Sequence, residues 1–168
     1  MALDDFFKRQ REQQEQKKEA ERALYEKLRK EREAKEEFEK KLPDFFKDVV
    51  DPAIEAVINR IKEEHLDGMY ASLGRRFRAA RPTQRISRDF GIDFQRNALQ
   101  FYIYPPADTF HITVEVSTDP RMDELKPVNK SKNFALEEFT AEVLLNVVGN
   151  ALEKLESLMK KDGKVIQL

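Results

Sequence analysis

Residues 90–117, FGIDFQRNALQFYIYPPADTFHITVEVS, decide the fold class of this chain. Apolar and polar side chains alternate through three runs, from Phe90 to Phe94, from Ala98 to Tyr104 and from Thr109 to Ser117. A period of two places alternate side chains on opposite faces of a strand. The segment therefore predicts three half-buried strands with turns at Arg96-Asn97 and Pro105–Asp108.

A consistent pairing of these strands exists if Gln95 faces Ala98 and Tyr104 faces Thr109. Three apolar rows of three side chains then form on one face, and a slip of one residue would destroy them. A weaker signal runs from Met69 to Phe77, so the sequence predicts an antiparallel meander of three or four strands. The rows are Phe94–Leu99–Val114, Ile92–Phe101–Ile112 and Phe90–Ile103–Phe110.

A helix is predicted over residues 52–67. Asp51 suits the N-cap and Pro52 the first helical position, where the missing N–H of proline costs nothing. Apolar residues then recur at spacings of three and four, and Gly68 is a natural stop after the last turn. A helix with one apolar stripe is expected to pack on the sheet.

A second helix is predicted over residues 135–161, which carry the longest apolar stripe of the chain. Asn133 is the expected N-cap, and Lys160 and Lys161 suit the negative end of the helix dipole. We expect this helix and the helix over 52–67 to cover the apolar face of the sheet. The predicted fold class is α+β.

The N-terminal segment differs in composition from the rest of the chain. Residues 4–41 contain neither Gly nor Pro and are rich in Glu, Lys, Arg, Gln and Ala, all strong helix formers. The composition changes at Pro43. We therefore expect a charged helical extension over residues 1–42 and an α+β domain over residues 43–168.

A heptad frame drawn through Leu24 and Leu28 tests this helix for a coiled-coil seam. Seven of its thirteen core positions are apolar, but none between Gln10 and Glu21 is, whereas a coiled coil needs several apolar heptads in succession. Three interpretations stay open: a solvated helix docked by its ends, a short oligomeric coiled coil around Leu24–Phe45, or disorder. The seven apolar positions are Leu3, Phe7, Leu24, Leu28, Phe38, Leu42 and Phe45.

The composition excludes several classes of protein. The 168 residues hold 31 basic and 32 acidic side chains, a formal net charge of −1, so the chain is not a uniformly basic nucleic-acid binder. No Cys is present, which excludes disulfides and thiolate chemistry, and only His65 and His111 could supply imidazole. No apolar run is long enough to span a membrane and the N-terminus lacks a signal-peptide pattern, so a cytoplasmic protein without metal or cofactor is expected.

Charge is nevertheless concentrated in one place. Residues 68–88 contain six Arg and no acidic residue. Planar guanidinium groups suit phosphate or carboxylate, and an aromatic ring among them can stack on a base. The alternatives are ion pairs with the acidic residues of 89–125 or with the N-terminal helix, contact with nucleic acid or another polyanion, and contact with an acidic protein. The candidate contact residues are Arg75, Arg76, Phe77, Arg78, Arg81, Arg85 and Arg88.

Catalytic signatures are missing from the sequence. The chain has no nucleophile elbow, zinc-protease helix, dinucleotide fingerprint or phosphate loop. The proposed register places Gly91, Tyr102 and His111 in one polar row, where His111 would be the single candidate for proton transfer. We expect a non-catalytic interaction or assembly protein that uses its N-terminal helix to bind a protein partner or a second copy, with nucleic-acid binding through Arg75–Arg88 as the alternative.

Overall fold

The computed structural model describes residues 1–73, 86–118 and 130–161. Its contacts divide the chain into two units, Met1–Lys40 and Lys41–Leu168. The first unit is helical from Ala2 onwards. The second combines helices with one antiparallel sheet, so the fold class is α+β.

Three helical segments follow one another without a break. They are the α-helix α1 (Ala2–Phe45), the π-helical stretch η1 (Phe46–Val50) and the α-helix α2 (Asp51–Glu64). The prolines at both ends of the π stretch explain its position. Pro43 lies inside α1 and Pro52 in the first turn of α2, and each removes one N–H donor from the helical ladder.

Helix α2 begins at Asp51, close to the predicted start, but the prediction that Asp51 is its N-cap is wrong. Val50 and Asp51 both have right-handed helical dihedrals, and the Asp51 N–H donates to Phe46 O, five residues back. A π turn changes the hydrogen-bond partner by one residue. The helical hydrogen bonding therefore continues past Pro52 without the non-helical N-cap that the sequence suggested. The Asp51 side chain pairs with Arg88 instead.

The end of α2 also differs from the prediction. His65 adopts the left-handed conformation (φ 51°, ψ 38°) and its N–H donates to Lys62 O at 3.3 Å. The helix therefore ends at Glu64 rather than at residue 67. Gly68 (φ 74°) lies in the following turn and leads the chain into the first strand.

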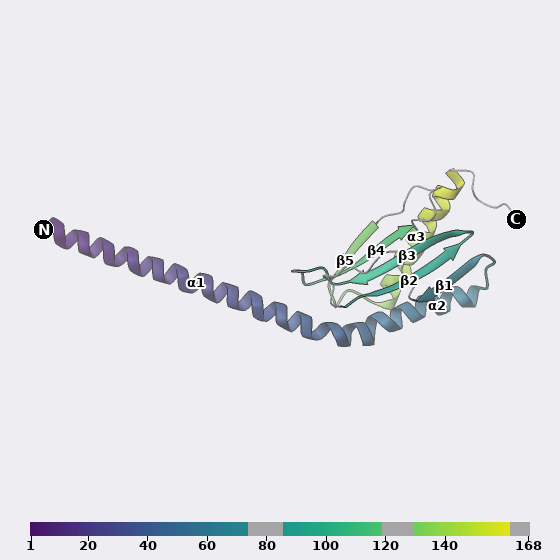
Figure 1. The fold of residues 1–168 in the computed structure, drawn as a ribbon, viewed down its shortest axis with the longest axis horizontal. Helices are drawn as coiled ribbons and strands as arrows, with labels where there is room; N and C mark the ends of the chain where they lie inside the picture. The colour runs from purple at the N-terminus through teal and green to yellow at the C-terminus, as the bar shows by residue number, and fades with distance from the viewer. Residues whose placement is uncertain (74–85, 119–129, 162–168) are drawn as a thin grey trace. The chain divides into compact units, whose positions relative to one another are not determined.

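The sheet is an antiparallel meander whose strands lie side by side in chain order (Figure 1). It has five strands, so the prediction of three or four was too low. The weakly signalled segment after residue 68 does form a strand, and one further strand was missed. The strands are β1 (Met69–Leu73), β2 (Arg88–Phe94), β3 (Asn97–Tyr104), β4 (Ile112–Thr118) and β5 (Lys130–Phe134).

The missed strand β5 has no alternating pattern that would reveal it. Its sequence is KSKNF, and its first four residues are exposed. Pairing with β4 holds it in place, and within that pairing Thr113 Oγ1 donates to Asn133 Oδ1 at 2.8 Å. Such a lysine-rich edge strand is formed by its neighbour rather than by its own apolar content.

The predicted strand pairing was wrong by an even number of residues. Leu99 pairs with Ile92 rather than Phe94, and with Thr118 rather than Val114. The first hairpin turns at Gln95-Arg96, both with positive φ (47° and 68°). Shifts of two and four residues leave each side chain on its predicted face, so the apolar face is correct although its rows are not.

The observed apolar rows form the core of the second unit. Phe90 pairs with Phe101, whose other neighbour is Val116, and the two phenyl rings stack with centroids 4.7 Å apart. Phe110 was predicted to belong to this core but lies before β4 and is 54% exposed. The fully buried side chains on this face include Phe90, Ile92, Leu99, Phe101, Ile103 and Ile112.

The last helix, α3 (Ala141–Lys161), starts six residues later than predicted. Asn133 belongs to β5 and caps nothing; the capping residue is Thr140, whose Oγ1 accepts from the Val143 N–H at 3.2 Å. Just before it, Phe139 is buried and packs edge-on against the rings of Phe45 and Phe134. The chain needs the intervening turn because it must leave the sheet before it can wind into a helix.

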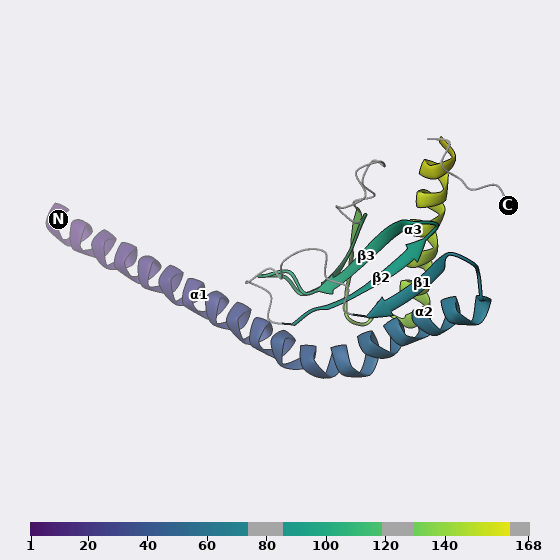
Figure 2. The same cartoon turned by 45° about the vertical axis from the view of Figure 1, so that its right-hand side comes forward.

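Helices α2 and α3 pack against each other, and α2 also contacts β1. Both views show α3 passing behind the strands (Figures 1 and 2). Arg88, on the same face as Phe90, reaches α2, and Val114 on that face shares a cavity with Val147 of α3. Residues on the apolar side of the sheet therefore meet α2 through Arg88 and α3 through Val114.

The two phenylalanines that the sequence placed together in the core should differ sharply when truncated. Phe101→Ala removes a ring with no exposed surface and should lower the free energy of unfolding by about 3–5 kcal/mol. Phe110→Ala should lower it by only about 1 kcal/mol, since half of that ring is in solvent. Urea unfolding of both variants measures the difference; equal losses would contradict the observed register.

Candidate functional site

The first unit exposes apolar side chains along α1. Six of them are between 46% and 70% exposed: Leu3, Phe6, Phe7, Leu24, Tyr25 and Leu28. Four of the six, Leu3, Phe7, Leu24 and Leu28, occupy the heptad core positions assigned from the sequence. Single exposed apolar side chains are ordinary, but these form two groups at helical spacing, an N-terminal patch (Leu3, Phe6 and Phe7) and a central patch (Leu24, Tyr25 and Leu28).

The last heptad positions of α1 already have a partner inside the second unit. Leu42 is only 6% exposed, and the Phe45 ring packs against Phe139 with centroids 6.1 Å apart. A coiled coil over the whole of Leu24–Phe45 would have to withdraw these two side chains from the core. The seam available to a partner helix therefore ends before Leu42.

Charged side chains cover the rest of α1. Arg29 pairs along the helix with Glu26 at 3.1 Å and with Glu33 at 3.9 Å, and all three side chains are more than half exposed. Exposed pairs of this kind contribute only a few tenths of a kcal/mol each. The two apolar patches are therefore the parts of the α1 surface that differ from its charged surroundings.

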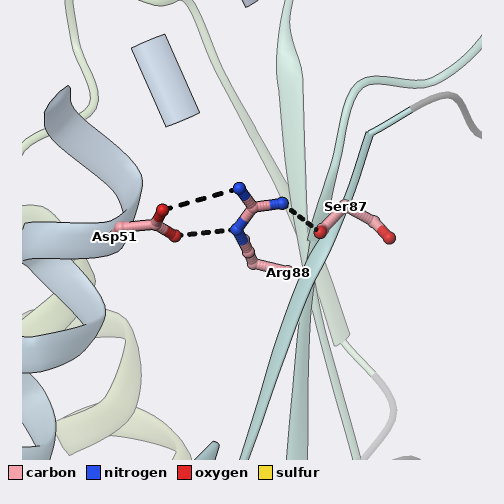
Figure 3. Close-up of polar contacts among 3 residues, drawn as sticks. All are labelled: Asp51, Ser87 and Arg88. Atoms are coloured by element: carbon pink, nitrogen blue, oxygen red, sulfur yellow. Dashed lines mark hydrogen bonds and ion pairs between the residues drawn. The ribbon is translucent and has the colours of Figure 1, made fainter. Parts of the chain in front are cut away.

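Among the predicted anion-contact residues, only Arg88 lies in the part of the chain that the structure describes. Its guanidinium faces the start of α2 (Figure 3). Arg88 Nε donates to Asp51 Oδ1 at 2.8 Å, Nη2 to Asp51 Oδ2 at 3.5 Å, and Nη1 to Ser87 O at 2.9 Å. The other candidates, Arg75, Arg76, Phe77, Arg78, Arg81 and Arg85, lie outside the described residues.

The position of Arg88 has an architectural use. Its guanidinium carbon lies 5.7 Å from the centre of the buried Phe46 ring, and its fork to Asp51 joins the first residue of β2 to the first residue of α2. A two-point pair fixes the geometry of both groups more firmly than a single contact. The sequence did not reveal this partner because Asp51-Pro52 resembled a helix cap.

The polar row that suggested proton transfer does not form. Gly91 pairs with Gln100, whereas Tyr102 pairs with Asp89 and Glu115. His111 precedes β4 and takes no part in this row. The prediction of this row failed because it depended on the wrong strand register. On the polar face of the sheet, the Tyr104 hydroxyl donates to Glu115 Oε1.

His65 lies where the sequence placed it, at the end of α2, and it is exposed. The left-handed backbone conformation of His65 ends the helix. Within the described residues no three His, Asp or Glu side chains gather in an arrangement that could hold a metal ion. Nor does any helix in those ranges combine the length and apolar content needed to cross a membrane.

Comparisons with protein-family models, curated proteins and solved structures find no match to this chain.

The Asp51–Arg88 pair should contribute measurably to stability. Because both side chains are nearly 40% exposed, we expect a coupling energy of about 1 kcal/mol in a double-mutant cycle of Asp51→Asn and Arg88→Gln, falling as salt is added. Chemical unfolding of the four proteins gives this value. The matched cycle on Arg60 and Glu64, an exposed pair one turn apart, should give about 0.3–0.5 kcal/mol; equal coupling in the two cycles would contradict a special role for Arg88.

Proposed function

We propose that this protein is a non-catalytic assembly protein whose helix α1 associates with α1 of a second copy through the central patch. The observation that carries the proposal is the exposure of Leu24, Tyr25 and Leu28 at 58%, 70% and 50% on a helix rich in charge. Nothing in the first unit buries them. A second amphipathic helix is the partner that such spacing fits.

Burial of the central patch between two copies would favour their pairing. Complete burial of one leucine side chain stabilises a complex by about 1.5–3 kcal/mol. Leu24 and Leu28 stand four residues apart and present adjacent knobs to a partner. The N-terminal patch lies about 25 Å further along the helix, at 1.5 Å per residue from Leu24 back to Phe7, and it could extend the same contact.

The polar interval between the two patches limits the kind of assembly. Core positions from Gln10 to Glu21 are all polar or charged. A continuous hydrophobic seam is therefore excluded, and polar residues at core positions favour particular registers at a cost in stability. We infer a reversible contact of moderate affinity rather than a permanent coiled coil.

Sedimentation velocity of the full chain over a range of concentrations tests the proposal. Leu24→Glu with Leu28→Glu should weaken self-association at least tenfold, because two charges replace the apolar contact. Both side chains are at least half exposed, so the thermal stability of the second unit should not change.

The matched control is Ala23→Glu with Lys30→Gln, which changes the net charge equally at two positions off the heptad seam. It should associate like the wild type. A wild-type chain that stays monomeric at every concentration, or a control that is equally impaired, would overturn the proposal.

Binding of nucleic acid through Arg75–Arg88 is our second candidate. It is supported by the six arginines of this segment, which connects β1 to β2. The Asp51 partner of Arg88 makes that residue the weakest member of the set. Phosphate contacts would come from the other five arginines, with Phe77 as the stacking group.

Titration with single- and double-stranded DNA and RNA across a salt series checks this candidate. Replacing Arg75, Arg76 and Arg78 with Ala should reduce both the affinity and the slope of log affinity against log salt, by up to about three in slope. Arg88→Gln alone should change the slope of log affinity against log salt by less than any one of the three alanine substitutions alone. Absence of binding at low salt would remove the candidate.

A further inference from the structure

Strands β4 and β5 and helix α3 line a cavity of about 260 Å³ that is open to solvent on one side. Its apolar floor is formed by Val114 and Val116 of β4 and by Val147 and Ala151 of α3. All four side chains are less than 9% exposed. The cavity belongs wholly to the second unit and has no part in the proposed association of α1.

Three lysines stand around this floor. In the sheet register Val116 pairs with Lys130 and Val114 with Lys132, so both lysines lie on the apolar side of the sheet. Lys154 follows Ala151 by three residues on α3, and all three lysines line the cavity. None of the described residues that line it is acidic.

Lysines on the inward side of an edge strand have one simple use, which is to prevent the strand from pairing with another sheet. That use requires no cavity beside them and no lysine on the opposite helix. An apolar floor flanked by lysines from two elements matches instead a ligand with one anionic end and an apolar body.

We propose that this cavity binds a small organic anion, namely an aliphatic monocarboxylate. The carboxylate would lie among the Lys130, Lys132 and Lys154 ammonium groups, and the aliphatic chain would lie on the four apolar side chains. A cavity of about 260 Å³ has room for a medium-length aliphatic chain.

The test is titration of the isotope-labelled full chain with octanoate, followed by amide and methyl NMR shifts. The expected result is saturable chemical-shift changes at Val114, Val116, Val147 and Ala151. Added salt should lower the affinity obtained from them. Two ligands serve as controls: octan-1-ol carries the same chain without charge and acetate the charge without the chain. Each should bind at least tenfold more weakly than octanoate.

Two variants locate the site. Lys130→Gln with Lys132→Gln should weaken octanoate at least tenfold, while Lys47→Gln with Lys62→Gln, exposed lysines of the same unit, should leave it unchanged. Ala151→Leu, which fills the floor, should abolish binding without altering the unfolding midpoint by more than a few degrees. Octanoate shifts that are absent, that map elsewhere, or that octan-1-ol reproduces at equal affinity would overturn the proposal.

Discussion

The stacking of Phe90 on Phe101 in neighbouring strands is the contact on which the second unit depends. It fixes the register of β2 and β3, and that register places Ile92, Leu99 and Ile103 on the same side. Val114 on that side shares a cavity with Val147 of α3. The same register positions Arg88 at the start of β2, where its side chain pairs with Asp51.

The fold class was readable from the sequence because alternation and helical spacing are local signals. Which face is buried was also correct, since the errors in pairing were even in number. The exact rows were not predictable: the turn at Gln95-Arg96 uses two non-glycine residues at positive φ, which no ordinary turn preference indicates. Strand β5 was missed because a strand that owes its existence to its neighbour need not be apolar.

The candidate sites show the same limit more strongly. The heptad frame on α1 was drawn from spacing alone, and only the structure separates Leu24 and Leu28, which are exposed, from Leu42, which is buried. The partner of Arg88 lies 37 residues away in the chain, beyond the reach of any local pattern. The cavity lysines could not be predicted for a similar reason, because Lys130, Ser131 and Lys132 line the cavity only when β5 pairs with β4.

The π stretch between α1 and α2 has a consequence for how this chain tolerates change in length. Buried positions from Leu42 onward fall at residues 42, 46, 50, 53 and 54, a spacing wider than the preceding heptad and set by η1. One residue deleted here would restore ordinary α winding and leave Ile54, Val57 and Ile58 at nearly the same angle around the axis, because a π turn holds one residue more than an α turn. Loss of one residue should therefore disturb the buried face of α2 less within these five residues than within α2 itself, where the same loss would turn the following side chains by about 100°.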